Sequence, residues 1–236
     1  MEMAKNHGAK DQKRAAKQKA KRQAKRSLNL ARTSKDPTVR LQRAEKWPVV
    51  QALVGDRLWE SGIGYVLIAR RDLEGGLVFA VFLVDVLCLG VKDAFWRAGT
   101  SADFEDMLRK MERVETMASS TPACLAKIVK GAVEFAQSFG FPPHPDYRHA
   151  SKLLDGIDPL SCSSKFSFGR AGKPFYMQGP NESFAQAAAI IQRVQKAGGH
   201  FIGSPSVDGR DESAEMGLEF ERFGALEHDE SDDEAD

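Results

Sequence analysis

One acidic side chain interrupts the most apolar segment of the chain. The segment LVFAVFLVDVLCL (77–89) is apolar at every position except Asp85. A buried carboxylate is costly unless it is hydrogen-bonded, paired with a cation or used in chemistry. At a strand end Asp85 is a candidate metal ligand or general base, as in a hydrolase or nuclease. We favour the structural alternative, in which Asp85 pairs with Lys92, Arg97 or a backbone amide.

Cys124 and His144 are the other candidates for catalysis. Cys124 is expected in the first turn of a helix capped by Thr121, and a helix N-terminus activates a thiol as a nucleophile. His144 or His149 would then be the general base, oriented by Asp146. The alternative is that Cys124 is simply a small buried residue, and we favour it because cysteine is among the most commonly buried residue types.

The same two histidines and Asp146 could form part of a metal site. His144 and His149 are five residues apart with Pro145 between them, whereas ligands on one helix prefer spacings of three or four. A further ligand is also missing from the pattern. We therefore expect no metal site and no cofactor.

The chain contains three cysteines, Cys88, Cys124 and Cys162. Their odd number and wide spacing predict reduced thiols in a cytoplasmic protein and argue against a disulfide framework. No apolar segment reaches the length of about 20 residues that a membrane span requires. We therefore expect a cytoplasmic protein that does not enter a membrane.

A basic and aromatic segment, FGRAGKPFY (168–176), combines Arg170 and Lys173 with Phe168, Phe175 and Tyr176. Such a segment can hold phosphates and stack bases. Alternatively, the aromatic side chains belong to the core, and the cations keep an edge strand soluble.

The strongest functional signal is a basic arm. Residues 1–35 carry twelve Lys or Arg and two acidic residues, a net charge of +10, with no apolar stripe. This pattern suits phosphate neutralisation by a segment that is disordered in isolation. The residues expected to contact nucleic acid are Lys13, Arg14, Lys17, Lys19, Lys21, Arg22, Lys25, Arg26, Arg170 and Lys173.

The opposite end of the chain is acidic. Residues 208–236 carry thirteen Asp or Glu and two Arg, a net charge of −11, so the overall charge of +1 is a cancellation. The segment EHDESDDEAD (227–236) predicts a solvated, disordered tail. Such a tail could bind basic protein partners.

The middle of the chain has the pattern of an α+β domain. Residues 49–62 suggest a short helix, and 63–71 with 77–89 suggest a hairpin whose second strand is buried on both faces. A helix is expected after the capping pattern Thr100–Asp103, and another from Pro122 to Gly140. A short helix (146–154), a second hairpin (165–179) and a last helix (183–197) are expected to follow.

These elements predict helices packed on a small antiparallel sheet built from two hairpins, with disordered charged tails. The expected organisation is an arm at 1–44, one domain at 45–206 and a tail at 207–236. The function we expect is non-enzymatic contact with nucleic acid, with RNA slightly favoured. The alternatives are a hydrolase or nuclease that uses Asp85, and a protein-interaction module with charged tails.

Overall fold

The computed structural model describes residues 22, 36–179 and 182–202. The chain divides into two compact units, Met1–Arg43 and Ala44–Asp236. Apart from Arg22, the described part of the first unit is Asp36 and the helix α2 (Pro37–Arg43) that follows it. The tails predicted to be disordered lie almost wholly outside the described residues.

The second unit is built on a five-stranded antiparallel sheet with the strand order β4-β3-β2-β1-β5. Strands β1 to β4 each lie beside the strand that follows in the sequence, so a short local connection joins each pair. The strands are β1 (Val49–Gly55), β2 (Ile63–Arg71), β3 (Leu77–Asp85), β4 (Gly90–Gly99) and β5 (Met117–Ser119).

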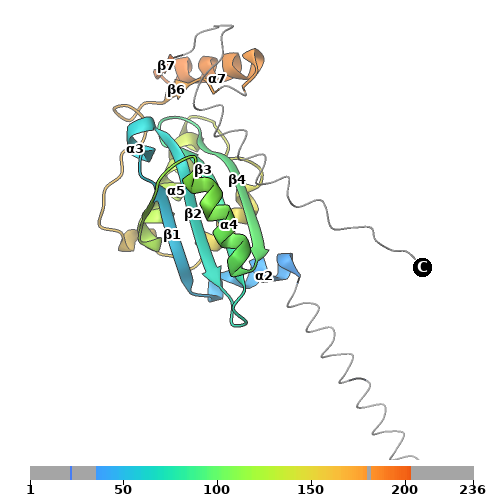
Figure 1. The fold of residues 1–236 in the computed structure, drawn as a ribbon. Helices are drawn as coiled ribbons and strands as arrows, with labels where there is room; N and C mark the ends of the chain where they lie inside the picture. The colour runs from blue at the N-terminus through green and yellow to red at the C-terminus, as the bar shows by residue number, and fades with distance from the viewer. Residues whose placement is uncertain (1–21, 23–35, 180–181, 203–236) are drawn as a thin grey trace, which may run out of the picture. The chain divides into compact units, whose positions relative to one another are not determined.

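Helices cover both faces of this sheet, which confirms an α+β domain (Figure 1). All nine residues of β3 are buried, as the apolar run 77–85 predicts for a strand covered on both sides. On one face, Phe79 packs against Phe104 of α4. On the other face, Phe82 contacts Tyr147 of α6, and α5 lies behind the sheet.

The predicted helix starts are confirmed by their caps. Thr100 and Asp103 form a reciprocal capping box, and Thr121 accepts the backbone N–H of Cys124. Ser183 caps the last helix. The helical elements of this unit are η1 (Ala44–Lys46), α3 (Leu58–Ser61), α4 (Ser101–Glu112), α5 (Pro122–Ser138), α6 (Tyr147–Ala150), η2 (Ser151–Leu154), η3 (Pro159–Ser161) and α7 (Phe184–Lys196).

The helix predicted over 49–62 is wrong, because 49–55 form strand β1 and only 58–61 are helical. A short apolar run does not distinguish a strand from a buried helix by its periodicity. Here the pairing of β1 with β2 decides the conformation, for example at Leu53 opposite Leu67. Strand β4 was also not predicted, since Lys92 and Asp93 obscure its alternating pattern.

The second predicted hairpin is also wrong. Of the segment 165–179, only β6 (Phe175–Met177) is a strand, and it pairs in parallel with β7 (His200–Ile202). Helix α7 connects the two strands, so this part is a small β–α–β unit, seen at one end of the sheet in Figure 1. The turn at Arg170 and Lys173 retains one isolated antiparallel bridge. The main sheet is therefore not built from two hairpins.

Arg70 is a buried cation that the sequence analysis missed. Its residue surface is 3% exposed, and burial lowers the pKa of its guanidinium. The guanidinium donates hydrogen bonds to four backbone carbonyls, with distances between 2.6 and 2.9 Å. These carbonyls belong to Glu45, Trp47, Leu153 and Asp155. Arg70 thus fixes two connections against the end of β2.

Candidate functional site

Asp85 lies at the end of β3, opposite Ile63 of β2, as the hairpin register predicts. Its Oδ1 accepts the backbone N–H groups of Leu87 at 2.8 Å and Cys88 at 2.9 Å. Its Oδ2 accepts the backbone N–H of Leu89 at 3.1 Å. The predicted pairing of Asp85 with backbone amides is therefore confirmed, and three N–H groups take part in it. Asp85 closes the tight turn that joins β3 to β4.

The electrostatic environment of Asp85 is mixed. Burial raises the pKa of its carboxyl group, while the nearby Lys92 ammonium and the three amide donors oppose this shift. Both carboxylate oxygens are already committed to the backbone of their own turn. This arrangement gives Asp85 a structural role, because its carboxylate stabilises the turn that ends the apolar segment.

A polar cluster lies beside this turn and joins it to the β–α–β unit. The Lys92 ammonium lies 2.9 Å from a carboxylate oxygen of Glu182. Glu182 also accepts hydrogen bonds from the Tyr176 hydroxyl and from the backbone N–H of Gly179. Burial raises the pKa of Glu182, but Lys92, Tyr176 and Gly179 outweigh it and hold the pKa below its usual value. Burial, together with Glu182, raises the pKa of Tyr176.

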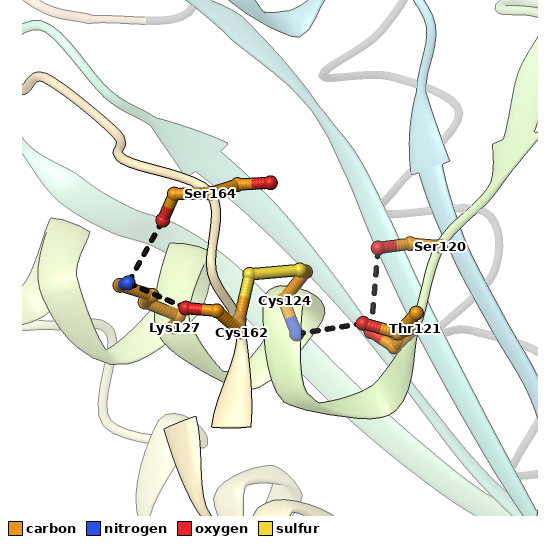
Figure 2. The surroundings of a disulfide bond; sticks show 6 residues. All are labelled: Ser120, Thr121, Cys124, Lys127, Cys162 and Ser164. Atoms are coloured by element: carbon orange, nitrogen blue, oxygen red, sulfur yellow. Dashed lines mark hydrogen bonds between the residues drawn. A yellow bond between two sulfur atoms is a disulfide. The ribbon is translucent and has the colours of Figure 1, made fainter. Parts of the chain in front are cut away.

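Cys124 and Cys162 form a disulfide, with their Cα atoms 4.9 Å apart (Figure 2). The expectation of reduced thiols is therefore wrong for these two cysteines, and only Cys88 is unpaired. The pairing is set by the tertiary fold, which places residue 162 beside the first turn of α5. The spacing of 38 residues carries no local signal for it.

The structure does not bring Cys124 and His144 together as a nucleophile and base. Cys124 lies in the first turn of α5 and is bonded to Cys162, whereas His144 follows the C-terminal end of α5 and its backbone N–H donates to the carbonyl of Val91. His144 instead faces two carboxylates, with Nδ1 3.6 Å from Asp93 and 3.8 Å from Asp146. His149 accepts a hydrogen bond from its neighbour Arg148. No cluster of three metal-ligating side chains occurs among the described residues.

Four aromatic rings form a chain of contacts that includes Trp59 of α3 and ends at Phe135 of α5. The Trp59 and Phe166 rings stack in parallel with their centroids 5.2 Å apart, and Trp59 remains 42% exposed. Phe168 lies 6.0 Å from Trp59 and 6.1 Å from Phe135 of α5. We call Trp59, Phe166, Phe168 and Phe135 the aromatic row. Its assembly from three separate segments leaves no signature in the sequence.

Arg170 and Lys173 are both exposed at the tight turn that follows the aromatic row. The Arg170 guanidinium carbon lies 3.5 Å from the centroid of the Phe175 ring, a cation–π contact. The Lys173 ammonium lies 3.5 Å from the carbonyl of Ala197 at the end of α7. Both candidates are therefore accessible to solvent, although each has a contact within the domain.

The rest of the predicted nucleic-acid interface lies in the basic arm. Arg22 is described and exposed, but the other arm candidates lie outside the described residues. These are Lys13, Arg14, Lys17, Lys19, Lys21, Lys25 and Arg26.

Comparison with known proteins adds no assignment, because no family model, curated protein or solved structure matches this chain. Within the described residues, helices of the length and apolarity needed to span a membrane do not occur.

Proposed function

We propose that this protein binds nucleic acid, with RNA slightly favoured over DNA, and that it does so without catalysis. The observation that carries the proposal is the net charge of +10 in residues 1–35. Cations at this density neutralise successive phosphates and release condensed counterions, which drives binding independently of sequence. Arg170 and Lys173 would add contacts from the folded domain.

One feature of the described domain supports single-stranded nucleic acid as the ligand. The exposed cations Lys165 and Arg170 flank Phe166 and Phe168 in the chain. Aromatic side chains next to cations suit single-stranded nucleic acid, whose unpaired bases can stack on exposed rings. A cytoplasmic location is part of this proposal, since RNA is abundant there.

The hydrolase or nuclease alternative gains no support from Asp85. A general base or metal ligand needs an oxygen that can reach a substrate or a metal ion, and both Asp85 oxygens accept backbone N–H groups.

A protein-interaction role is the second candidate, and one specific observation favours it. The β–α–β unit exposes four large apolar side chains, of which Phe184 is 77% and Ile202 is 62% exposed. Met177 and Phe201 are the others. Exposed apolar side chains gathered in one small unit are typical of a surface that contacts another protein.

The test of nucleic acid binding compares the full chain with a variant that lacks residues 1–35. For a single-stranded RNA, the logarithm of the binding constant of the full chain should fall with the logarithm of salt by about 0.7 per phosphate neutralised. The truncated chain should lose most of this affinity and retain the circular dichroism of the folded domain. Equal binding by the two proteins would refute the role of the arm.

A matched control keeps the length of the arm and lowers its net charge from +10 to +2. In this variant the eight arm candidates are replaced by Gln, and it should bind as weakly as the truncated chain. A second variant with Arg170→Gln and Lys173→Gln measures the contribution of the domain. If only this second variant loses affinity, the turn and not the arm is the binding site.

A further inference from the structure

The segment 155–173 has one buried side chain, that of Cys162. Between Leu154 and Pro174 no other residue is buried, and Cys162 is 4% exposed. Ser161 and Ser163 on either side of it are exposed. The disulfide to Cys124 is therefore the central attachment of a stretch that otherwise lies on the surface.

The remaining attachments of this segment are polar or only partly buried. The Lys127 ammonium donates to the carbonyls of Cys162 at 2.9 Å and Ser164 at 2.8 Å (Figure 2). Phe166 and Phe168 contribute the ring contacts of the aromatic row. Near its two ends, the carbonyl of Asp155 accepts a hydrogen bond from Arg70 at 2.6 Å, and the N–H of Gly169 donates to the carbonyl of Val86 at 2.9 Å. These contacts hold the ends of the segment, whereas the disulfide is the covalent attachment of its middle.

The surroundings of the disulfide favour its cleavage by a thiol. Cys124 is the third residue of α5, where the backbone N–H groups and the helix dipole stabilise negative charge. The Lys127 ammonium lies one turn further along the same helix and adds positive charge. A thiol reaches the partly buried Cys124 more readily than the buried Cys162, so the first exchange forms a mixed disulfide at Cys124 and releases the Cys162 thiol. A second thiol then attacks the mixed disulfide and releases the Cys124 thiolate, which the helix N-terminus and Lys127 stabilise. A better leaving thiolate makes exchange faster.

We infer that Cys124 and Cys162 form a reversible thiol–disulfide exchange site that controls the attachment of 155–173, and with it the aromatic row. The reductant is a cellular thiol of the glutathione class. Two such thiols supply two electrons and two protons, the Cys124–Cys162 bond breaks, and the products are two protein thiols and the oxidised disulfide of the reductant. Oxidation by the reverse exchange restores the attachment. This inference does not depend on nucleic acid binding.

Cys88 provides an internal contrast, because its environment is the opposite of that of Cys124. Cys88 is fully buried, and burial together with the charge of Asp85 raises the pKa of its thiol. A buried, protonated thiol reacts slowly with alkylating reagents. Labelling of Cys88 therefore reports global unfolding, whereas labelling of Cys124 and Cys162 reports exchange in the folded protein.

The first experiment incubates the oxidised full-length chain with millimolar reduced glutathione in the absence of denaturant. Iodoacetamide is then added, and peptide mass spectrometry locates the alkyl groups. We expect labels on Cys124 and Cys162 under conditions that leave Cys88 unlabelled, and recovery of the disulfide after addition of oxidised glutathione. Reduction that occurs only together with labelling of Cys88 would show a structural disulfide and overturn the proposal.

The second experiment tests the conformational consequence through Trp59. Because Trp59 stacks on Phe166, four residues after Cys162, reduction should change the tryptophan emission of the native protein. The double variant Cys124→Ser and Cys162→Ser should resemble the reduced wild type. Trp59→Phe should remove the change, since Trp47 and Trp96 do not belong to the aromatic row. Unchanged emission after complete reduction of the wild type would contradict control of the segment.

Discussion

The ammonium of Lys92 lies 2.9 Å from the carboxylate of Glu182, and both side chains are about four-fifths buried. Lys92 belongs to β4 of the main sheet, whereas Glu182 precedes α7 in the β–α–β unit. The Tyr176 hydroxyl donates to the same carboxylate. One carboxylate therefore joins the main sheet to the β–α–β unit.

This ion pair should make stability depend on pH in the acidic range. The pKa of Glu182 is lowered in the folded protein from a usual value of 4.5. The stabilisation is therefore fully present above pH 4.5 and is lost as the pH falls from there through the folded pKa. We expect Glu182→Gln to lower the free energy of unfolding by about 1–3 kcal/mol at pH 7, and the difference to shrink in acid. Urea titrations at a series of pH values measure both effects.

The matched control for that experiment is the exposed pair Arg57–Glu60. Its atoms are 3.8 Å apart, and the Glu60 side chain is 76% exposed. Because solvent and salt screen such a pair, Glu60→Gln should change stability very little at any pH. A loss as large as that of Glu182→Gln would mean that the measurement reports net charge and not the buried contact.

Asp85→Asn should destabilise the domain by about 1–3 kcal/mol, because one of the two carboxylate oxygens becomes an NH₂ group that faces a backbone N–H donor. Urea denaturation monitored by circular dichroism measures this loss. Asp85→Leu should cost more, since it leaves the N–H groups of Leu87, Cys88 and Leu89 without their acceptor. If Asp85→Asn kept full stability and removed a measurable activity, the catalytic interpretation of Asp85 would replace the structural one.

The turn that Asp85 closes also requires a glycine at position 90. Gly90 has a φ of +69°, and a Cβ there would lie 2.9 Å from the backbone oxygen of Ala132. Gly75 has a similar φ of +87° but nothing within 4 Å of an added Cβ. Gly75→Ala should therefore cost only the backbone strain of about 1–2 kcal/mol, and Gly90→Ala should cost more. Equal losses in thermal unfolding would exclude a role for the contact with α5.

The elements that could be predicted from the sequence are those with local signals. The helix caps at Thr100, Thr121 and Ser183 depend on residues three positions apart, and the Asp85–Ile63 register follows from one tight turn. Two-sided burial of β3 follows from the apolar run at 77–84. In each case the information lies within a few residues of the element itself.

What could not be predicted depends on contacts between distant segments. The parallel pairing of β6 with β7 is made across helix α7, and the disulfide joins residues 38 positions apart. Nothing in the sequence distinguishes Arg70 from other charged strand residues. Its role depends on four backbone carbonyls that come from two distant segments of the chain. Trp59 contacts Phe166 only when α3 and the segment 155–173 are both in their folded positions. Such contacts arise from tertiary structure and leave no spacing to detect.

The opposite charges at the two ends of the chain lead us to expect that the acidic segment weakens nucleic acid binding by the basic arm. Charges of +10 in 1–35 and −11 in 208–236 attract without fixed geometry, and the tether keeps their local concentration high. We therefore expect the acidic segment to compete with phosphates for the arm. Deleting 227–236 should tighten RNA binding, most strongly at low salt, because the Debye length grows from about 8 Å at 0.15 M to about 30 Å at 0.01 M ionic strength. Thermal stability should stay unchanged.

A paired salt titration of the full chain and the deletion variant against one RNA and one DNA of equal length measures this competition. The matched control keeps the tail length and replaces the acidic residues of 227–236 by Asn and Gln, which should tighten binding as much as the deletion. Because competition acts through the phosphate sites of the arm, a chain lacking residues 1–35 should show no response to the tail. Equal affinities with and without 227–236 across the whole salt range would refute internal competition and leave the acidic segment as a separate docking site for basic partners.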